Sequence, residues 1–266
     1  METLDLAVLE HRLETSFLGR RVIYRESIDS TQDLARAEAE EDAPEGTLVL
    51  ADAQTAGRGR QGRSWVSPPA SNLYFTLVLR PSIDQLTRLG MIVPLAIAQG
   101  LETATPLVCG IKWPNDVFVK GKKISGALID SDIDGDIVRF ALVGIGINVN
   151  FDLRLFPEIA DTATSVLTET GTNGSREAIL AAVLNAFETH YAANRAPALF
   201  TEWRGRLINL GKRVAIHDYD GTVVEGLAES VKESGALLLK LDDGTVREFS
   251  AGQLNIPNLL PARDLA

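Results

Sequence analysis

The residues best suited to chemistry lie in one stretch that mixes glycine with arginine. Residues 57–63 read Gly-Arg-Gly-Arg-Gln-Gly-Arg, so three glycines and three arginines share seven positions. Glycine lets a backbone approach a ligand closely. Arginine carries a permanent charge on a planar fork of donors that matches carboxylate and phosphate groups. The stretch therefore predicts a loop that closes around an anion.

The same glycines match the G-x-G-x-x-G spacing of dinucleotide-binding folds. That fold needs a strand before the glycines and a helix that begins among them. The apolar run 46–54 predicts the strand, but Pro68 and Pro69 exclude a helix interior after Gly62. Residues 72–80 then alternate like a second strand. We therefore expect a β-loop-β unit and reject a nicotinamide or flavin dinucleotide as its ligand.

A nucleic-acid-binding module is the second alternative for this basic loop. Gly-Arg segments that bind RNA are usually long, repetitive and embedded in basic chains. This one is short, and the whole chain carries a formal net charge of −10. An acidic surface repels nucleic acid. The alternative stays open, and it predicts an affinity that depends strongly on salt.

Two further motifs place polar side chains at the ends of expected strands. In Lys112-Trp113-Pro114-Asn115-Asp116, the proline favours an extended Trp113, which puts Lys112 at a strand end. Lysine is a compact cation suited to a phosphate or carboxylate. The run 144–150 is an apolar strand with two glycines, which indicate a bulge or a close backbone approach. Asn148 ends that strand, where its amide is placed to meet a ligand.

Periodicity predicts alternating helices and strands, followed by a small β-rich unit. The expected helices are 4–18, 32–41, 83–103, 176–191 and 199–207. After Gly211 the pattern changes to the short strands 213–217, 222–231, 236–241 and 245–250, separated by Asp-Gly and Ser-Gly turns. Such short strands and tight turns predict a small β-barrel with its own core.

The composition points to a globular protein of a reducing compartment. The single cysteine excludes an internal disulfide and a Cys-rich metal site. The acidic N-terminus has no signal-peptide pattern. The most apolar helix-like run, 91–101, is too short to cross a bilayer. We therefore expect a cytoplasmic protein with no membrane partner.

Taken together, the motifs resemble those of the biotin protein ligase family. They occur in that family's order and cover residues about 20 to 150: Asp29-Ser30-Thr31, Gln54 to Arg63, Asn72-Leu73-Tyr74, Lys112 to Asp116, Lys123-Ile124-Ser125-Gly126 and Gly144 to Asn148. The resemblance implies an α+β fold with a central mixed β-sheet flanked by helices, like that of class II synthetases. It further implies a catalytic domain over 1–209 and a small SH3-like β-domain over 210–266.

The resemblance implies a two-step reaction, and it assigns residues to it. Biotin and ATP form biotinyl-5′-AMP and pyrophosphate, and the biotin then passes to one lysine of a biotin carboxyl carrier protein. The implied catalytic residues are Lys112 and Arg58. The implied biotin contacts are Ser30, Thr31, Gln32, Gln54, Arg58, Gly59, Arg60, Lys112 and Gly126. The implied nucleotide contacts are Arg58, Arg60, Arg63, Trp65, Asn115 and Asn148. Mg²⁺ is implied with ATP, and the three scattered histidines give no metal-ligand spacing.

Departures from the family pattern set further expectations. Gln32 stands where the family often has asparagine, and residues 160–165 offer no tryptophan to stack on adenine. The residues before the strand expected at Arg21 are too few for a winged helix, so we expect a ligase without DNA-binding activity. A lipoate–protein ligase of the same fold is the nearest alternative. The run 137–149 is expected as a long edge strand, which would allow a homodimer.

Overall fold

The computed structural model describes residues 3–193, 196–217 and 221–256, which form two β-sheets with flanking helices. The larger sheet has seven strands in the order β1-β2-β3-β7-β6-β5-β4, and only β1 and β2 run parallel. Its strands are β1 (Val22–Ile28), β2 (Leu48–Gln54), β3 (Leu73–Leu79), β4 (Gly110–Lys112), β5 (Asp116–Val119), β6 (Lys122–Asp134) and β7 (Ile137–Ile147). Because β2 and β3 are antiparallel neighbours, the expected β-loop-β unit around the glycine–arginine stretch is confirmed.

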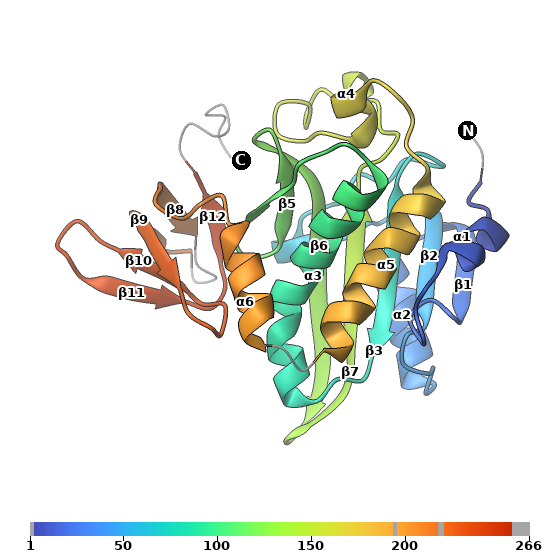
Figure 1. Ribbon diagram of the computed structural model, residues 1–266, viewed down its shortest axis with the longest axis horizontal. Coiled ribbons are helices and arrows are strands. Elements are labelled where there is room, and N and C mark those ends of the chain that lie inside the picture. The colour runs from blue at the N-terminus through green and yellow to red at the C-terminus, as the bar shows by residue number, and fades with distance from the viewer. Residues whose placement is uncertain (1–2, 194–195, 218–220, 257–266) are drawn as a thin grey trace.

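Helices cover both faces of this sheet (Figure 1). Helices α3 and α5 pack on one face, and α2 packs on the other. The helices are α1 (Leu6–Arg12), α2 (Thr31–Glu40), α3 (Ile83–Ala104), α4 (Val166–Thr170), α5 (Arg176–Ala192) and α6 (Ala196–Gly205). Two short 3-10 turns span Arg60–Gly62 and Leu153–Leu155. On its face of the sheet, α2 packs against β2, β3 and β7, and the polar motifs meet beside it, toward β5 and β6.

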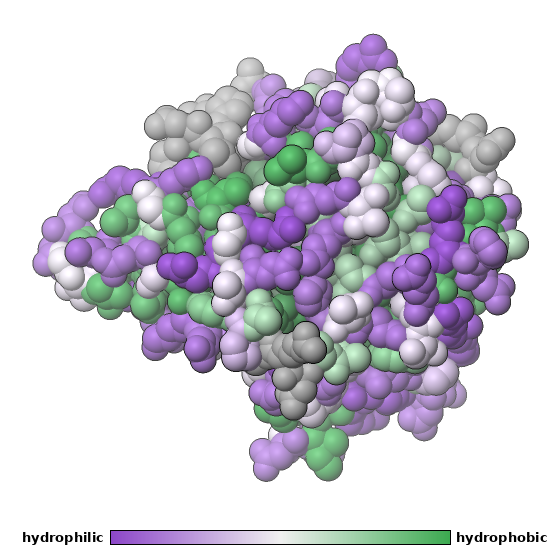
Figure 2. All heavy atoms as spheres, in the orientation of Figure 1, coloured by the Kyte–Doolittle hydropathy of each residue, from purple (hydrophilic) through white to green (hydrophobic). Residues whose placement is uncertain are grey.

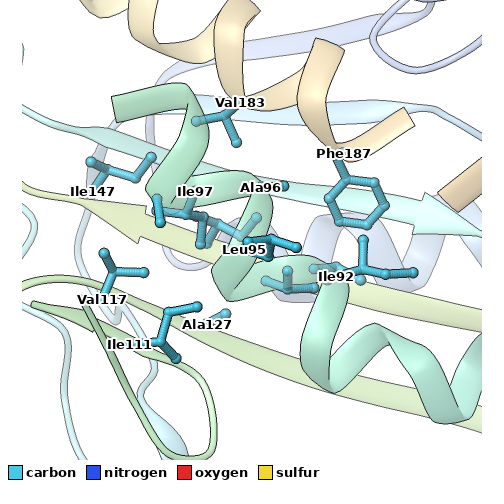
Figure 3. Packing of buried hydrophobic residues seen from close by; sticks show 14 of the residues in the cluster. Ile92, Leu95, Ala96, Ile97, Ile111, Val117, Ala127, Ile147, Val183 and Phe187 are labelled. Carbon is cyan, nitrogen blue, oxygen red and sulfur yellow. The ribbon is translucent and has the colours of Figure 1, made fainter. Parts of the chain in front are cut away.

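The main core lies between the sheet and the pair α3 and α5 (Figure 3). Ile92, Leu95 and Ile97 of α3 lie with Val183 and Phe187 of α5 against alternate residues of the sheet. The sheet residues in this core alternate along their strands, because every second side chain of a strand points to the same face. Pro94 lies within α3, and the helix is nevertheless continuous from Ile83 to Ala104. Hydrophilic residues occupy much of the outer surface on this side (Figure 2).

A buried ion pair ties the end of β2 to the start of α5. Asp52 and Arg176 are 3% and 5% exposed, and their oxygen and nitrogen atoms lie 2.6 Å apart. Tyr24 donates a hydrogen bond to the other carboxylate oxygen. Arg176 also donates to the carbonyl of Asn72, which precedes β3. The pair therefore joins β1, β2, α5 and the start of β3.

We expect Asp52→Ala to destabilise the fold by about 3–5 kcal/mol, because Arg176 would keep a buried charge with its carboxylate partner removed. Urea unfolding measures the difference. Glu38→Ala is the control, since Glu38 pairs with Arg21 at the surface and should change stability by less than about 1 kcal/mol. Equal losses of stability in the two variants would contradict the claim that the buried pair contributes more to stability than the surface pair.

The second sheet has five strands in the order β11-β10-β9-β8-β12. Its strands are β8 (Arg213–His217), β9 (Val223–Val231), β10 (Leu237–Lys240), β11 (Val246–Phe249) and β12 (Gln253–Asn255). All its pairings are antiparallel, and it lies beside the β4 edge of the larger sheet (Figure 1). The fully buried Trp113 joins the two, because its indole N–H donates to the carbonyl of Gly235 at 2.9 Å.

Two expectations about individual elements were wrong, and one strand was not predicted. The strand over 137–149 is not at an edge: β7 pairs with β3 on one side and β6 on the other, so this strand offers no free edge to a second copy. The helix expected over 4–18 spans only Leu6–Arg12, because Leu13 is already extended. Strand β12 had no sequence signal of its own and forms because it pairs with β8. Within the described residues, no helix is long and apolar enough to cross a membrane.

Candidate active site

One row of residues crosses the larger sheet on its α2 side. The strand registers pair Lys112 with Asp116, Asp116 with Gly126, Gly126 with Gly146, and Gly146 with Tyr74. Directly paired residues point to the same face of a sheet. The row thus sets a lysine and a carboxylate beside two positions that have no side chain.

The two glycines form a flat floor on which other side chains lie. A Cβ atom at Gly146 would lie 2.4–2.7 Å from the indole ring of Trp65. A Cβ atom at Gly126 would lie 2.8 Å from Cε and Nζ of Lys123. Such distances are too short for real contacts, so glycine is required for these side chains to rest on the sheet. The indole nitrogen of Trp65 is buried with no hydrogen-bond partner among the described residues.

Lys123 is the site residue that sequence reasoning missed. Its ammonium lies 2.8 Å from Asp116 and 5.4 Å from the centre of the Trp65 ring. Simple alternation would place Lys123 on the same face as Ser125, which points to the core. A shift of register between Val117 and Phe118 inserts one extra residue into β6, and Lys123 therefore turns to the face of Asp116.

The charges of this cluster perturb one another. Burial alone would raise the pKa of the Asp116 carboxyl, but the charges of Lys123 and Lys112 outweigh burial and leave that pKa below its ordinary value. Burial lowers the pKa of the Lys112 ammonium, against the opposing charge of Asp116. Lys123, Arg63 and Arg60 lower the Lys112 pKa further. One carboxylate thus lies among four cationic side chains, and the resulting net positive charge favours the binding of an anion.

The glycine–arginine loop reaches over this cluster and is held at several points. Arg60 donates to the side-chain oxygen of Asn115 at 2.6 Å and to the carbonyl of Gly252 at 2.7 Å. Arg58 pairs with Asp33 of α2 at 2.8 Å, and both side chains are about half exposed. The amide of Gly59 donates to the carbonyl of Arg63, which closes the loop into a tight turn. The arginines are therefore ordered by protein partners before any ligand is considered.

Asn115 is engaged at both ends of its amide. Its oxygen accepts from Arg60, and its nitrogen donates to the carbonyl of Ala127. In this structure it connects the loop to the sheet, and its expected contact with the nucleotide stays a prediction.

The N-terminus of α2 carries a second polar group, next to the floor. Ser30 is the N-cap of α2 and accepts from the amide of Gln32. Gln54 accepts from the amide and the hydroxyl of Thr31. Thr76 of β3 donates to Thr31 and Gln32. The four residues expected around the head group of the ligand, Ser30, Thr31, Gln32 and Gln54, are thus neighbours.

On the other side of the loop, Asn148 lies against the segment that follows β7. Its side-chain nitrogen donates to the carbonyl of Thr164 at 3.0 Å, and it is 4% exposed. This segment contains a small apolar cluster in which Phe156 packs against Phe151, with ring centres 4.6 Å apart, and Val66 packs beside them. An apolar surface therefore adjoins Trp65, although residues 160–165 contribute no aromatic ring.

A surface hollow of about 410 Å³ lies elsewhere, at the β5–β6 turn beside α4. Val108, Lys120 and Glu169 are among its lining residues, and none of the lining residues belongs to the charged cluster. The volume of this hollow does not identify it as the active site. The converging charges, the buried polar groups and the glycine floor identify the charged cluster as the candidate active site.

Comparison with known proteins places the fold and these motifs together. Residues 24–148 match the biotin/lipoate A/B protein ligase family, and residues 210–253 match the biotin protein ligase C terminal domain. The chain is 37% identical to the bifunctional ligase/repressor BirA of Bacillus spizizenii over 246 residues, covering 90% of this chain and 75% of that protein. It is also 37% identical to a biotin--[acetyl-CoA-carboxylase] ligase of Paracoccus denitrificans over 203 residues, covering 72% of this chain and 83% of that one.

A solved structure gives the same result. The biotin protein ligase of Aquifex aeolicus, in complex with biotin and ATP, superposes with a TM-score of 0.74 at 30% identity. The match covers 89% of this chain and 98% of that one. The central mixed sheet with its helices is therefore confirmed, as is the additional C-terminal sheet. The chain belongs to the biotin protein ligase family.

Proposed function

We infer that this protein is an ATP-dependent ligase that activates biotin as biotinyl-5′-AMP and transfers it to a lysine of a biotin carboxyl carrier protein. The observation that carries this inference is the meeting of Lys112, Lys123 and Arg60 on a glycine-floored face of the sheet. The substrates are inferred from the family to which the chain belongs, and this arrangement of cations suits a reaction that brings two anions together.

The first step brings two anions together. A biotin carboxylate oxygen attacks the α-phosphorus of ATP, a new C(O)–O–P linkage forms, and pyrophosphate leaves with the electrons of the broken P–O bond. Fixed cations lower the repulsion between the reactants and stabilise the charge of the transition state. We propose that Lys112 and Lys123 hold the carboxylate and the α-phosphate, and that Arg58, Arg60 and Arg63 hold phosphate oxygens. No covalent enzyme intermediate is needed.

The polar group at the start of α2 is proposed to bind the ureido head of biotin. Ser30, Thr31 and Gln54 offer hydroxyl and amide groups that match its N–H and C=O groups. Gly59 and Gly126 would allow close approach of the ligand. The side-chain nitrogen of Gln32 donates a hydrogen bond to Asp130, so we propose that Gln32 helps to orient this polar group at the start of α2.

The nucleotide is proposed to lie toward Trp65 and Asn148. The indole of Trp65, which lies on the sheet at Gly146, and the neighbouring apolar cluster are proposed to offer a surface for the base. Asn115 is proposed to act through Arg60, which it orients.

Mg²⁺ is proposed to enter the site with ATP, as part of the MgATP substrate. Across residues 3–193, 196–217 and 221–256, no group of three or more His, Cys, Asp or Glu side chains is arranged to hold a metal ion. The ion would bridge phosphate oxygens and neutralise the charge of the leaving pyrophosphate.

In the second step the carrier protein supplies the nucleophile. The neutral ε-amine of its lysine attacks the acyl carbon of biotinyl-5′-AMP, an amide forms, and AMP leaves with the electrons of the acyl–oxygen bond. The carrier is proposed to be a domain of acetyl-CoA carboxylase or a related carboxylase, as the names of the relatives indicate.

We propose that residues 1–209 form the catalytic domain and residues 210–266 the second domain. The second sheet begins at Arg213 and the C-terminal family match at residue 210, which supports this division. A cytoplasmic location is proposed because ATP is the substrate and the single cysteine, Cys109, is free and buried.

The test measures pyrophosphate release with MgATP and biotin, lipoate or no acid. We expect release with biotin and background release with lipoate. Release that depends on lipoate alone would establish the lipoate ligase instead. The nucleic-acid alternative is disfavoured because the whole chain carries a formal net charge of −10, and an acidic surface repels nucleic acid. A gel-shift titration at low salt should show no binding.

A further inference from the structure

Two lysines of the enzyme lie beside one carboxylate at the place where the activated acyl group is proposed to form. Asp116 lies 2.8 Å from the ammonium of Lys123 and is the direct cross-strand partner of Lys112. Lys112 is 8% exposed, and its ammonium lies 4.9 Å from the centre of the Phe118 ring. The other charged groups that face it, Arg60 and Arg63, are cationic.

These lysines present a chemical hazard that the proposed function creates. Biotinyl-5′-AMP acylates amines, and the carrier's lysine reacts because its amine is neutral. A neutral Lys112 or Lys123 would attack the same acyl carbon, form an amide and release AMP, and its surplus proton would pass to solvent. A protonated ammonium has no lone pair and cannot attack.

We propose that Asp116 protects the enzyme from acylating itself, by keeping Lys112 and Lys123 as ammonium groups while they hold the ligand. This inference rests on the proposed function. A nearby opposite charge favours the charged form of an amine, whereas burial and like charges favour the neutral form. Burial and three cationic neighbours act on Lys112, and Asp116 is the carboxylate that opposes them. The lysines can therefore serve as cations beside a reactive acyl group without being consumed by it.

The test uses the full chain and chemically prepared biotinyl-5′-AMP, so that it does not depend on the first step. The wild type, Asp116→Asn and Asp132→Asn are incubated with it, and acylated lysines are identified by peptide mass. Asp132 is a matched control, because it lies farther along β6, pairs with Arg139 and forms no ion pair with a lysine among the described residues. We expect at least tenfold more acylation of Lys112 or Lys123 in Asp116→Asn than in the other two proteins.

Wild-type transfer from biotinyl-5′-AMP to a carrier domain is measured in parallel. Its failure would count against the proposed function, whereas transfer with both lysines unmodified in folded Asp116→Asn would overturn the protective role alone. If Asp116→Asn fails to fold, the order in which the lysines of the wild type are acylated tests the proposal instead. On long incubation its exposed Lys120 and Lys240 should be acylated before Lys112 and Lys123. Earlier acylation of either site lysine would overturn the proposal.

Discussion

Replacing Lys112 or Lys123 with methionine is expected to reduce biotin-dependent pyrophosphate release by about 10²–10³-fold, the usual loss when one group that stabilises a developing charge is removed. Methionine keeps much of the length of the lysine stem and removes the charge. Lys112→Met leaves the ion pair between Asp116 and Lys123 in place, and Lys123→Met leaves Asp116 under the positive charge of its cross-strand neighbour Lys112, so the fold should survive. Initial rates of pyrophosphate release with saturating MgATP measure the effect.

Lys240→Met is the matched control for both lysines. Lys240 lies in β10 of the second sheet and pairs with Glu229 at 3.5 Å, away from the charged cluster. Its loss should leave the rate within about twofold, as expected for a surface substitution. If Lys123→Met kept the wild-type rate while Lys112→Met lost it, Lys112 would be the essential cation and the role given to Lys123 would be wrong.

Gly126→Ala should impair the same step without removing any charge. The added Cβ would lie 2.8 Å from Nζ of Lys123 and 3.2 Å from the carboxylate of Asp116. Gly126 is in extended strand β6, which accepts alanine, so the effect arises from contact and not from backbone strain. The ammonium must move, and a displacement of about 1 Å in a reacting group can cost about 10²-fold in rate. We expect a loss of about 10–10²-fold in the rate of adenylate formation.

Gly90→Ala controls for the added methyl group. Gly90 lies within α3, and a Cβ there would meet no atom within 4 Å. This variant should be as active as the wild type and slightly more stable, since alanine favours a helix by about 1 kcal/mol over glycine. Equal activity of Gly126→Ala and Gly90→Ala would show that the position of the Lys123 ammonium does not matter.

The sequence allowed the motifs and their order to be predicted because each follows a local rule. Prolines after Gly62 excluded a helix, and Pro114 placed Lys112 at a strand end. The position of β7 inside the sheet could not be predicted, because strand order depends on long-range pairing. A strand read alone looks the same at an edge and in the centre.

Lys123 shows the same limit within the site. Its motif was recognised as a strand with a glycine, but its side chain reaches the cluster through a register shift in β6. An extra residue in one strand has no signature in hydrophobic alternation. The hydrogen bonds of Asn115 to Arg60 and Ala127 could not be predicted either, because they depend on a loop and a neighbouring strand that only the fold brings near.

The most direct measurement of the central claim is the intact mass of a biotin carboxyl carrier domain after incubation with this protein, biotin and MgATP. The proposed function predicts that the carrier gains the mass of one biotinyl group on a single lysine, that the gain requires ATP, and that Lys123→Met slows it strongly. An unchanged carrier mass with biotin, together with a gain when lipoate replaces biotin, would contradict it.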